Sequence, residues 1–108
     1  MAKVPSFYAA FQNRHPDIAK AYEALGDATR AAGPLDAKTA ALIKLALAAG
    51  ARMEGGVHSH VRRALAAGAS DEELRHVALL GITTLGFPSA MAVRAMIDDE
   101  LAKADRRA

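Results

Sequence analysis

Residues 37–49, AKTAALIKLALAA, constrain the fold more than any other segment, because a helix with this sequence has almost no polar face. Its large apolar residues point in all directions, and only Lys44 interrupts them. A helix that is apolar all round has to be buried all round. Residues 71–82 are broadly apolar in the same way.

Two such helices are many for a chain of 108 residues. One of them can form the centre of the domain, and the other is then expected to meet a second subunit, because broad apolar surfaces mark interfaces. The pattern therefore favours a homo-oligomer. The alternative is a monomer whose small alanine faces pack tightly against one another.

Caps and helix breakers predict about six helices. About a quarter of the residues are alanine, the best helix former, and no alternating apolar pattern indicates a strand. Ser70 and Glu73 have the spacing of a capping box, and Gly68 stands where a helix would end. We expect an all-α bundle in a single domain, 1–108. The expected helices cover about 5–14, 17–32, 37–49, 57–67, 71–82 and 88–101.

Charge and cysteine content exclude several classes of protein. The net charge is only +2 and the charges are interspersed, so no nucleic-acid partner is expected. The chain has no cysteine, which excludes disulfides, thiolate metal sites and a cysteine nucleophile. No apolar run reaches about 18 residues and no signal-peptide pattern opens the chain, so a cytoplasmic protein without a membrane span is expected.

The histidines of MEGGVHSH, residues 53–60, are the candidate chemical groups. On a helix His58 and His60 point about 200° apart, so they cannot share one metal ion, and neither a metal nor another cofactor is expected. Glu54 lies four residues before His58 and can pair with it. A histidine beside a turn of a buried helix can carry protons, and the alternative is a histidine that only caps or bonds a neighbouring helix.

The stretch from Leu35 to Ala90 resembles the carboxymuconolactone decarboxylase and alkylhydroperoxidase D-like family. The most specific part is His60-Val61-Arg62, followed by the alanine-rich turn and the capped helix at Ser70. The resemblance implies an all-helical fold that assembles as trimers, or as hexamers of paired subunits. The oligomer inferred from the apolar helices agrees with this.

The resemblance also identifies positions where this chain differs from peroxidase members of the family. Those members carry a C-x-x-C pair, and its positions here are Met53 and Gly56. The glutamate of their proton relay would fall near Ala41, so of that relay only His60 remains. Without a thiol pair there is no centre for disulfide exchange, and a cysteine-dependent peroxidase is not expected.

The decarboxylase branch of the family implies acid–base chemistry instead. His60 can donate a proton to a carbanion-like product, and cationic groups can hold a substrate carboxylate. The branch usually has an acidic residue near Gly56 and an aromatic residue near Thr84, and both are absent here. The candidate substrate-binding residues are Arg52, Arg62, Arg63, His58 and Glu54.

Two hypotheses about function follow. The first is decarboxylase or lyase chemistry on a small carboxylated substrate, with His60 as the catalytic residue. The second is a non-catalytic oligomeric scaffold, or a small-molecule-binding protein, whose active site is degenerate.

Overall fold

A computed structural model describes residues 6–107 of the chain. Over these residues the protein forms six α-helices and no strand, which confirms the predicted all-α class. The helices separate into two compact units, residues 1–36 and 37–108, which are described in turn. The single domain predicted over 1–108 stays a prediction.

The first unit contains α1 (Ser6–Arg14) and α2 (Pro16–Ala31), which pack on each other. Pro16 begins α2, where its missing N–H costs nothing. The amide of Gln12 in α1 donates to Glu23 of α2 at 3.0 Å. Helix α1 begins within one residue of the prediction, and the predicted start itself, Pro5, lies outside the described residues.

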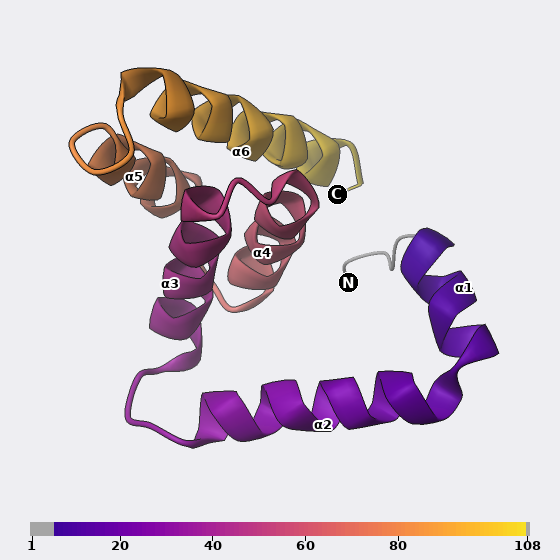
Figure 1. The fold of residues 1–108 in the computed structure, drawn as a ribbon. Helices are drawn as coiled ribbons and strands as arrows, with labels where there is room; N and C mark the ends of the chain where they lie inside the picture. Colours follow the sequence, from indigo (N-terminus) through magenta and orange to yellow (C-terminus); the bar gives the residue numbers. More distant parts are fainter. Residues whose placement is uncertain (1–5, 108) are drawn as a thin grey trace. The chain divides into compact units, whose positions relative to one another are not determined.

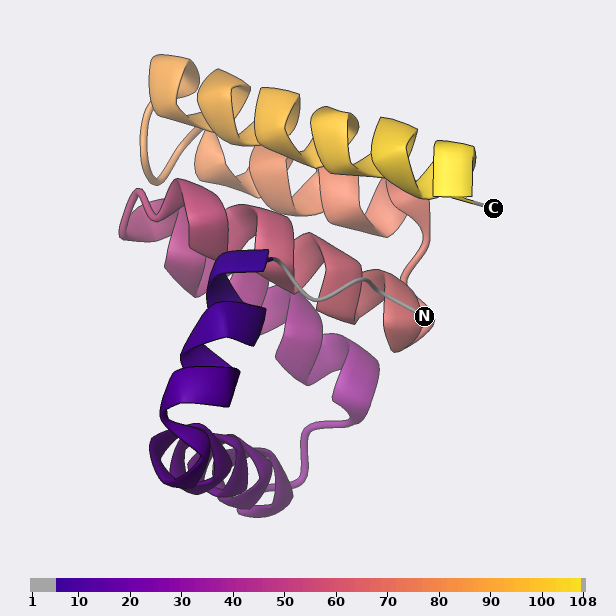
Figure 2. The same cartoon turned by 90° about the vertical axis from the view of Figure 1, so that its right-hand side faces the viewer.

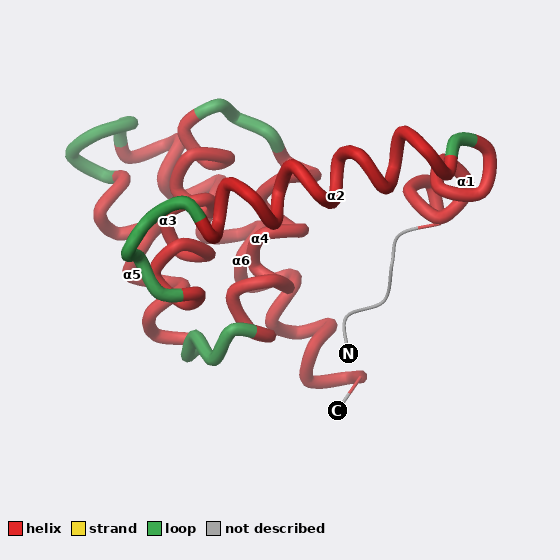
Figure 3. Tube along the Cα trace, turned by 90° about the horizontal axis from the view of Figure 1, so that it is seen from below, coloured by secondary structure: helices red, strands yellow, loops and turns green. Residues whose placement is uncertain are grey.

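The second unit contains α3 (Ala37–Gly50), α4 (Glu54–Ala66), α5 (Asp71–Gly81) and α6 (Phe87–Arg107). Helices α3 and α4 form an antiparallel pair, and α6 lies along both α4 and α5 (Figures 1 and 2). Short turns connect the four helices (Figure 3). The buried core residues of this unit are Leu45, Ala48, Ala49, Val57, Val61, Ala64, Ala69, Leu74, Ala78, Val93, Ile97 and Leu101.

The junction between α4 and α5 has the local structure that the sequence predicts. Gly68 adopts φ +97°, which is why a glycine follows the end of α4. The Glu73 N–H donates to the Ser70 hydroxyl at 3.1 Å, and the Ser70 N–H donates to the Glu73 carboxylate at 2.9 Å. The capping box is therefore confirmed, and Lys38 of α3 pairs with the same Glu73 at 3.0 Å.

The glycine pair Gly55-Gly56 does not lie just before α4, where the sequence predicts it. The helix begins at Glu54, so Gly55 and Gly56 lie inside its first turn instead of preceding it. A Cβ on Gly56 would lie 3.2 Å from Met53 Cβ and 3.3 Å from Ala48 Cβ, whereas a Cβ on Gly55 would meet nothing within 4 Å. Of the two glycines, only Gly56 is therefore required for the close approach of α4 to α3.

Neither α3 nor α5 is buried all round within a single chain, so the expectation that one of them forms a fully buried centre of the domain is wrong. On α3 only Leu45, Ala48 and Ala49 are buried, and Leu47 keeps 66% of its surface exposed. On α5, Leu80 is 61% exposed. Each helix therefore presents a second apolar face to the outside. None of the described helices is both long enough and apolar enough to cross a membrane.

Candidate functional site

Helix α4 directs its two histidines toward different neighbours. His58 contacts Glu100 of α6, whereas the charge of Lys44 on α3 acts on His60. This is the separation that helix geometry gives for residues two apart. The two side chains therefore point to different neighbours, as the helix geometry predicts, although the sequence predicts His58 among the substrate-binding residues of the His60 site.

His60 is half-buried, and its Nδ1 atom is shielded from solvent without a hydrogen-bond partner in the described part of the chain. Burial lowers its pKa below the ordinary value of 6.5, and the positive charges of Lys44 and Arg63 lower it further. The imidazole is consequently neutral at neutral pH. A neutral imidazole with an unpaired nitrogen can accept or relay a proton, and the two cations favour a negative charge beside it.

Glu100 is the centre of a charged cluster between α4 and α6. It is only 3% exposed, and its Oε1 atom accepts a hydrogen bond from His58 Nδ1 and one from Arg62, both at 3.0 Å. Lys103 approaches the same oxygen to 3.7 Å. Because Nδ1 donates to a carboxylate, it carries a proton, and Nε2 faces Glu54, 3.9 Å away.

Sequence reasoning missed Glu100, although a signal was present. Glu100 lies in the acidic run Asp98-Asp99-Glu100, which resembles a solvated surface. However, it follows the buried Val93 and Ile97 by seven and three residues, so helical periodicity places it on the buried face of α6.

The three arginines predicted to bind substrate lie in different environments. Arg62 is committed to the buried Glu100, and Arg63 is exposed beside His60. Arg52 donates to the Ser89 hydroxyl at 3.1 Å. Of the residues predicted to form one site, Arg63 thus lies near His60. Glu54 and His58 instead pair with each other, as the i,i+4 spacing predicts.

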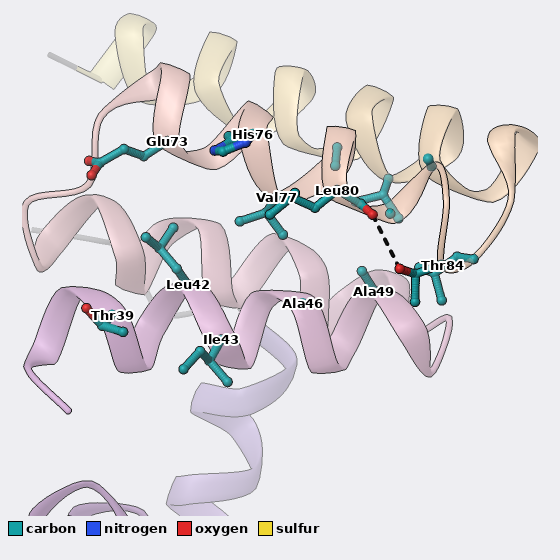
Figure 4. Close-up of a pocket in the computed structure, with 15 residues that line it drawn as sticks. Thr39, Leu42, Ile43, Ala46, Ala49, Glu73, His76, Val77, Leu80 and Thr84 are labelled. Carbon is teal, nitrogen blue, oxygen red and sulfur yellow. Dashed lines mark hydrogen bonds between the residues drawn. The ribbon is translucent and has the colours of Figure 1, made fainter. Parts of the chain in front are cut away.

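A groove of about 450 Å³ runs between α3 and α5. Leu42 of α3 and Val77 of α5 point toward each other across it, and Glu73 and His76 lie toward one end (Figure 4). Thr84 lies toward the other end, and its hydroxyl donates to the Leu80 carbonyl at 3.5 Å. The walls are mainly apolar, so the groove suits an apolar surface or molecule.

A second cavity of about 340 Å³ lies between the start of α4 and the first half of α6. Arg52, Glu54 and Ser89 supply its polar lining. The apolar part of its lining consists of Ala49, Val57, Pro88, Ala92, Val93 and Met96. His60 lines neither this cavity nor the groove between α3 and α5.

Met53 and Gly56 sit at the start of α4, where the resemblance places the redox cysteines. Met53 is the N-cap residue and is mostly exposed, and the Cβ position of Gly56 lies next to its Cβ. The backbone thus keeps the two positions adjacent, although neither carries a thiol. Within the described residues, no three histidine, cysteine or carboxylate side chains group as metal ligands would.

Comparison with known proteins identifies the family of the chain. The family model described as "Carboxymuconolactone decarboxylase family" matches residues 16–99, a span that extends beyond the predicted core, 35–90, at both ends. The chain matches no curated protein and no solved structure. Because the matched span is well over half of the sequence, and its helices agree with the all-α fold, the chain belongs to the carboxymuconolactone decarboxylase family.

Proposed function

We propose that this protein carries out a lyase-type proton transfer, of the decarboxylase kind, on a small carboxylated substrate, with His60 as the proton carrier. The observation that carries the proposal is the half-buried His60 ring, whose shielded Nδ1 atom has no partner in the described chain. A buried polar atom without a partner calls for an explanation, and a reacting group is one. Membership of the family supports the same type of chemistry.

The surroundings of His60 favour an anionic substrate. Lys44 and Arg63 both place positive charge near the ring. A carboxylate held by these cations would lie beside a neutral imidazole, which first takes up a proton from the solvent. Because its pKa is lowered, the imidazolium then releases that proton readily to a carbanion-like carbon. When a carboxyl group leaves as carbon dioxide, its bonding electron pair stays on the carbon, and the proton from His60 completes the product.

The proposed active form is a homo-oligomer in the cytoplasm, a trimer or a hexamer. The apolar faces of α3 and α5 support this part of the proposal, since Leu47 and Leu80 are exposed in one chain. An assembled neighbour would also close the space around the half-exposed His60, and water exclusion strengthens the electrostatic interactions that the reaction uses.

A second candidate function is supported by a different observation. The groove of about 450 Å³ is mainly apolar and does not include His60. It therefore supports a non-catalytic protein that binds a small apolar molecule, with the histidine site degenerate.

A thermal-shift screen of small carboxylates and lactones tests the proposed function. We expect a subset of these compounds to raise the melting temperature of the wild type and to be converted to a decarboxylated or rearranged product. His60→Gln should abolish turnover, whereas His76→Gln, on an exposed histidine of the apolar groove, should not. Conversion that survives in His60→Gln would refute the role of His60.

The same two variants separate the candidates. Ligands that shift the wild type and His60→Gln equally, without conversion, and lose their effect in His76→Gln would support the binding protein instead. Peroxide consumption with a thiol reductant is expected to stay at the background measured without protein, because the chain has no cysteine.

A further inference from the structure

We propose that the cavity between the start of α4 and α6 binds a small α-hydroxy or α-amino carboxylic acid with a compact apolar body. The cavity measures about 340 Å³, at the small end of the range for ligand sites. It combines a cation, a hydroxyl group, a carboxylate and an apolar wall. Each of these features matches one part of such a ligand.

Arg52 supplies the group for the ligand's carboxylate. Among the described residues, no carboxylate lies within ion-pair distance of Arg52, whereas four other arginines, Arg30, Arg62, Arg75 and Arg94, each have such a partner. The guanidinium of Arg52 carries five N–H donors, and its one hydrogen bond in the described chain goes to Ser89 at 3.1 Å. Its planar fork can therefore bind a carboxylate with two parallel hydrogen bonds.

The backbone of Arg52 gives a second reason to expect a role for its side chain. Arg52 has φ +57°, and among the described residues it is the only one other than glycine with a positive φ. A glycine would adopt this conformation without strain. Strained positions of this kind cluster at ligand sites. We therefore expect that the arginine side chain, which a glycine would lack, is needed at this position.

Glu54 sets the requirement for a donor group on the ligand. Its side chain lines the same cavity and would repel a simple carboxylate. A hydroxyl or ammonium group next to the ligand's carboxylate would instead donate to Glu54. His58 Nε2 lies 3.9 Å from Glu54, and His58 itself is held by Glu100, so the carboxylate of Glu54 has a fixed neighbour on one side.

The apolar wall favours a branched aliphatic body. Val57 and Val93 are buried, and Met96 beside them is half-buried. A short aliphatic chain of the ligand would cover these side chains and leave its polar end at Arg52 and Glu54. The site is separate from that proposed for His60, because His60 does not line this cavity.

Isothermal titration calorimetry on the full-length protein tests the proposal with three acids of one carbon skeleton. The acids are leucine, its α-hydroxy analogue, and the acid that lacks the α-substituent. We expect saturable binding of at least one of the first two, and binding of the third that is about tenfold weaker or absent, because a hydrogen bond to a charged group is lost. No saturable binding of either donor-bearing acid at millimolar concentration would overturn the proposal.

Two variants locate the binding. Arg52→Gln should weaken it by about tenfold or more, since the charge-assisted hydrogen bonds are lost. The matched control is Arg75→Gln, which removes a charge on α5 outside the cavity and should change the affinity less than about twofold. Equal binding of all three acids, or an affinity unchanged in Arg52→Gln, would overturn the proposal. His60→Gln should bind as the wild type does, so the two proposals fail independently.

Discussion

His58 and Glu100 join α4 to α6 through a hydrogen bond of 3.0 Å between residues 42 positions apart in the sequence. The carboxylate is buried, and Arg62 donates to the same oxygen. A buried charge is tolerated only when it is paired and hydrogen-bonded, so these three side chains depend on one another. The contact also fixes the direction in which His58 presents Nε2.

Glu100→Ala is expected to lower the free energy of unfolding by about 2–3 kcal/mol, because it leaves the part-buried Arg62 without its counter-charge. Chemical denaturation measures the loss. Asp99→Ala is the matched control, since Asp99 is the exposed neighbour and pairs with Lys103 near the surface. That control should cost less than about 1 kcal/mol. Equal effects of the two variants would contradict a central role for Glu100.

The pKa of His60 is expected to lie below 6.5 when the imidazole is followed by NMR as a function of pH, because burial and two cations disfavour its charged form. Between the folded pKa and 6.5 the unfolded chain binds more protons than the folded one, so stability falls as the pH falls through this range. His60→Gln should remove that part of the pH dependence. A His60 pKa above 6.5 would disprove the assignment.

Lys44→Met separates the causes of this shift. Removing the positive charge on α3 should raise the pKa of His60 toward its ordinary value, and the remaining shift then reports burial together with Arg63. Lys38, on the same helix, offers a control. It pairs with Glu73, so Lys38→Met should leave the His60 titration nearly unchanged.

The sequence predicts the helices well because their ends depend on neighbouring residues. Pro16, Gly68 and the Ser70 capping box each fix a boundary through contacts within a few residues. The start of α4 is the exception. There the glycine pair resembles a break, but Gly56 is a point of contact with Ala48 of α3, which only the packed structure reveals.

The candidate site is predicted less well, because its partners come from different helices. The i,i+4 pair of Glu54 and His58 can be read from the spacing, and the structure brings them within 3.9 Å. The link from His58 to Glu100 depends on how α6 packs on α4. Short-range patterns carry no information about such packing.

A matched pair of glycine substitutions tests the close contact between α3 and α4. Gly55→Ala should stabilise the protein by up to about 0.5–1 kcal/mol, because alanine favours the helix and its Cβ meets nothing within 4 Å. Gly56→Ala brings the same helical gain but places a Cβ 3.3 Å from Ala48 Cβ. The melting temperature of Gly56→Ala should therefore be below that of Gly55→Ala, and the reverse order would contradict the contact.

Restoring two cysteines tests whether the start of α4 keeps the geometry of a redox pair. In the double variant Met53→Cys, Gly56→Cys, the two Cβ atoms would start 3.2 Å apart, and a shift of a few tenths of an ångström reaches the range of a disulfide. Mild oxidation should remove two hydrogen atoms, as mass spectrometry detects. The control Met53→Cys, Gly55→Cys should stay reduced under the same conditions, because a Cβ on Gly55 has no neighbour within 4 Å.

The exposed apolar faces predict an assembly larger than one chain. Light scattering should give a mass of about three or six times 11.3 kDa, since α3 and α5 leave Leu47 and Leu80 uncovered. Leu80→Glu should lower this mass while the helical circular dichroism stays unchanged, because Leu80 is largely exposed within a single chain. Ala66→Glu, on an exposed position of α4 outside the groove, should leave the mass unchanged. A wild-type mass near 11.3 kDa would contradict this prediction and would indicate a monomer whose alanine faces pack tightly against one another.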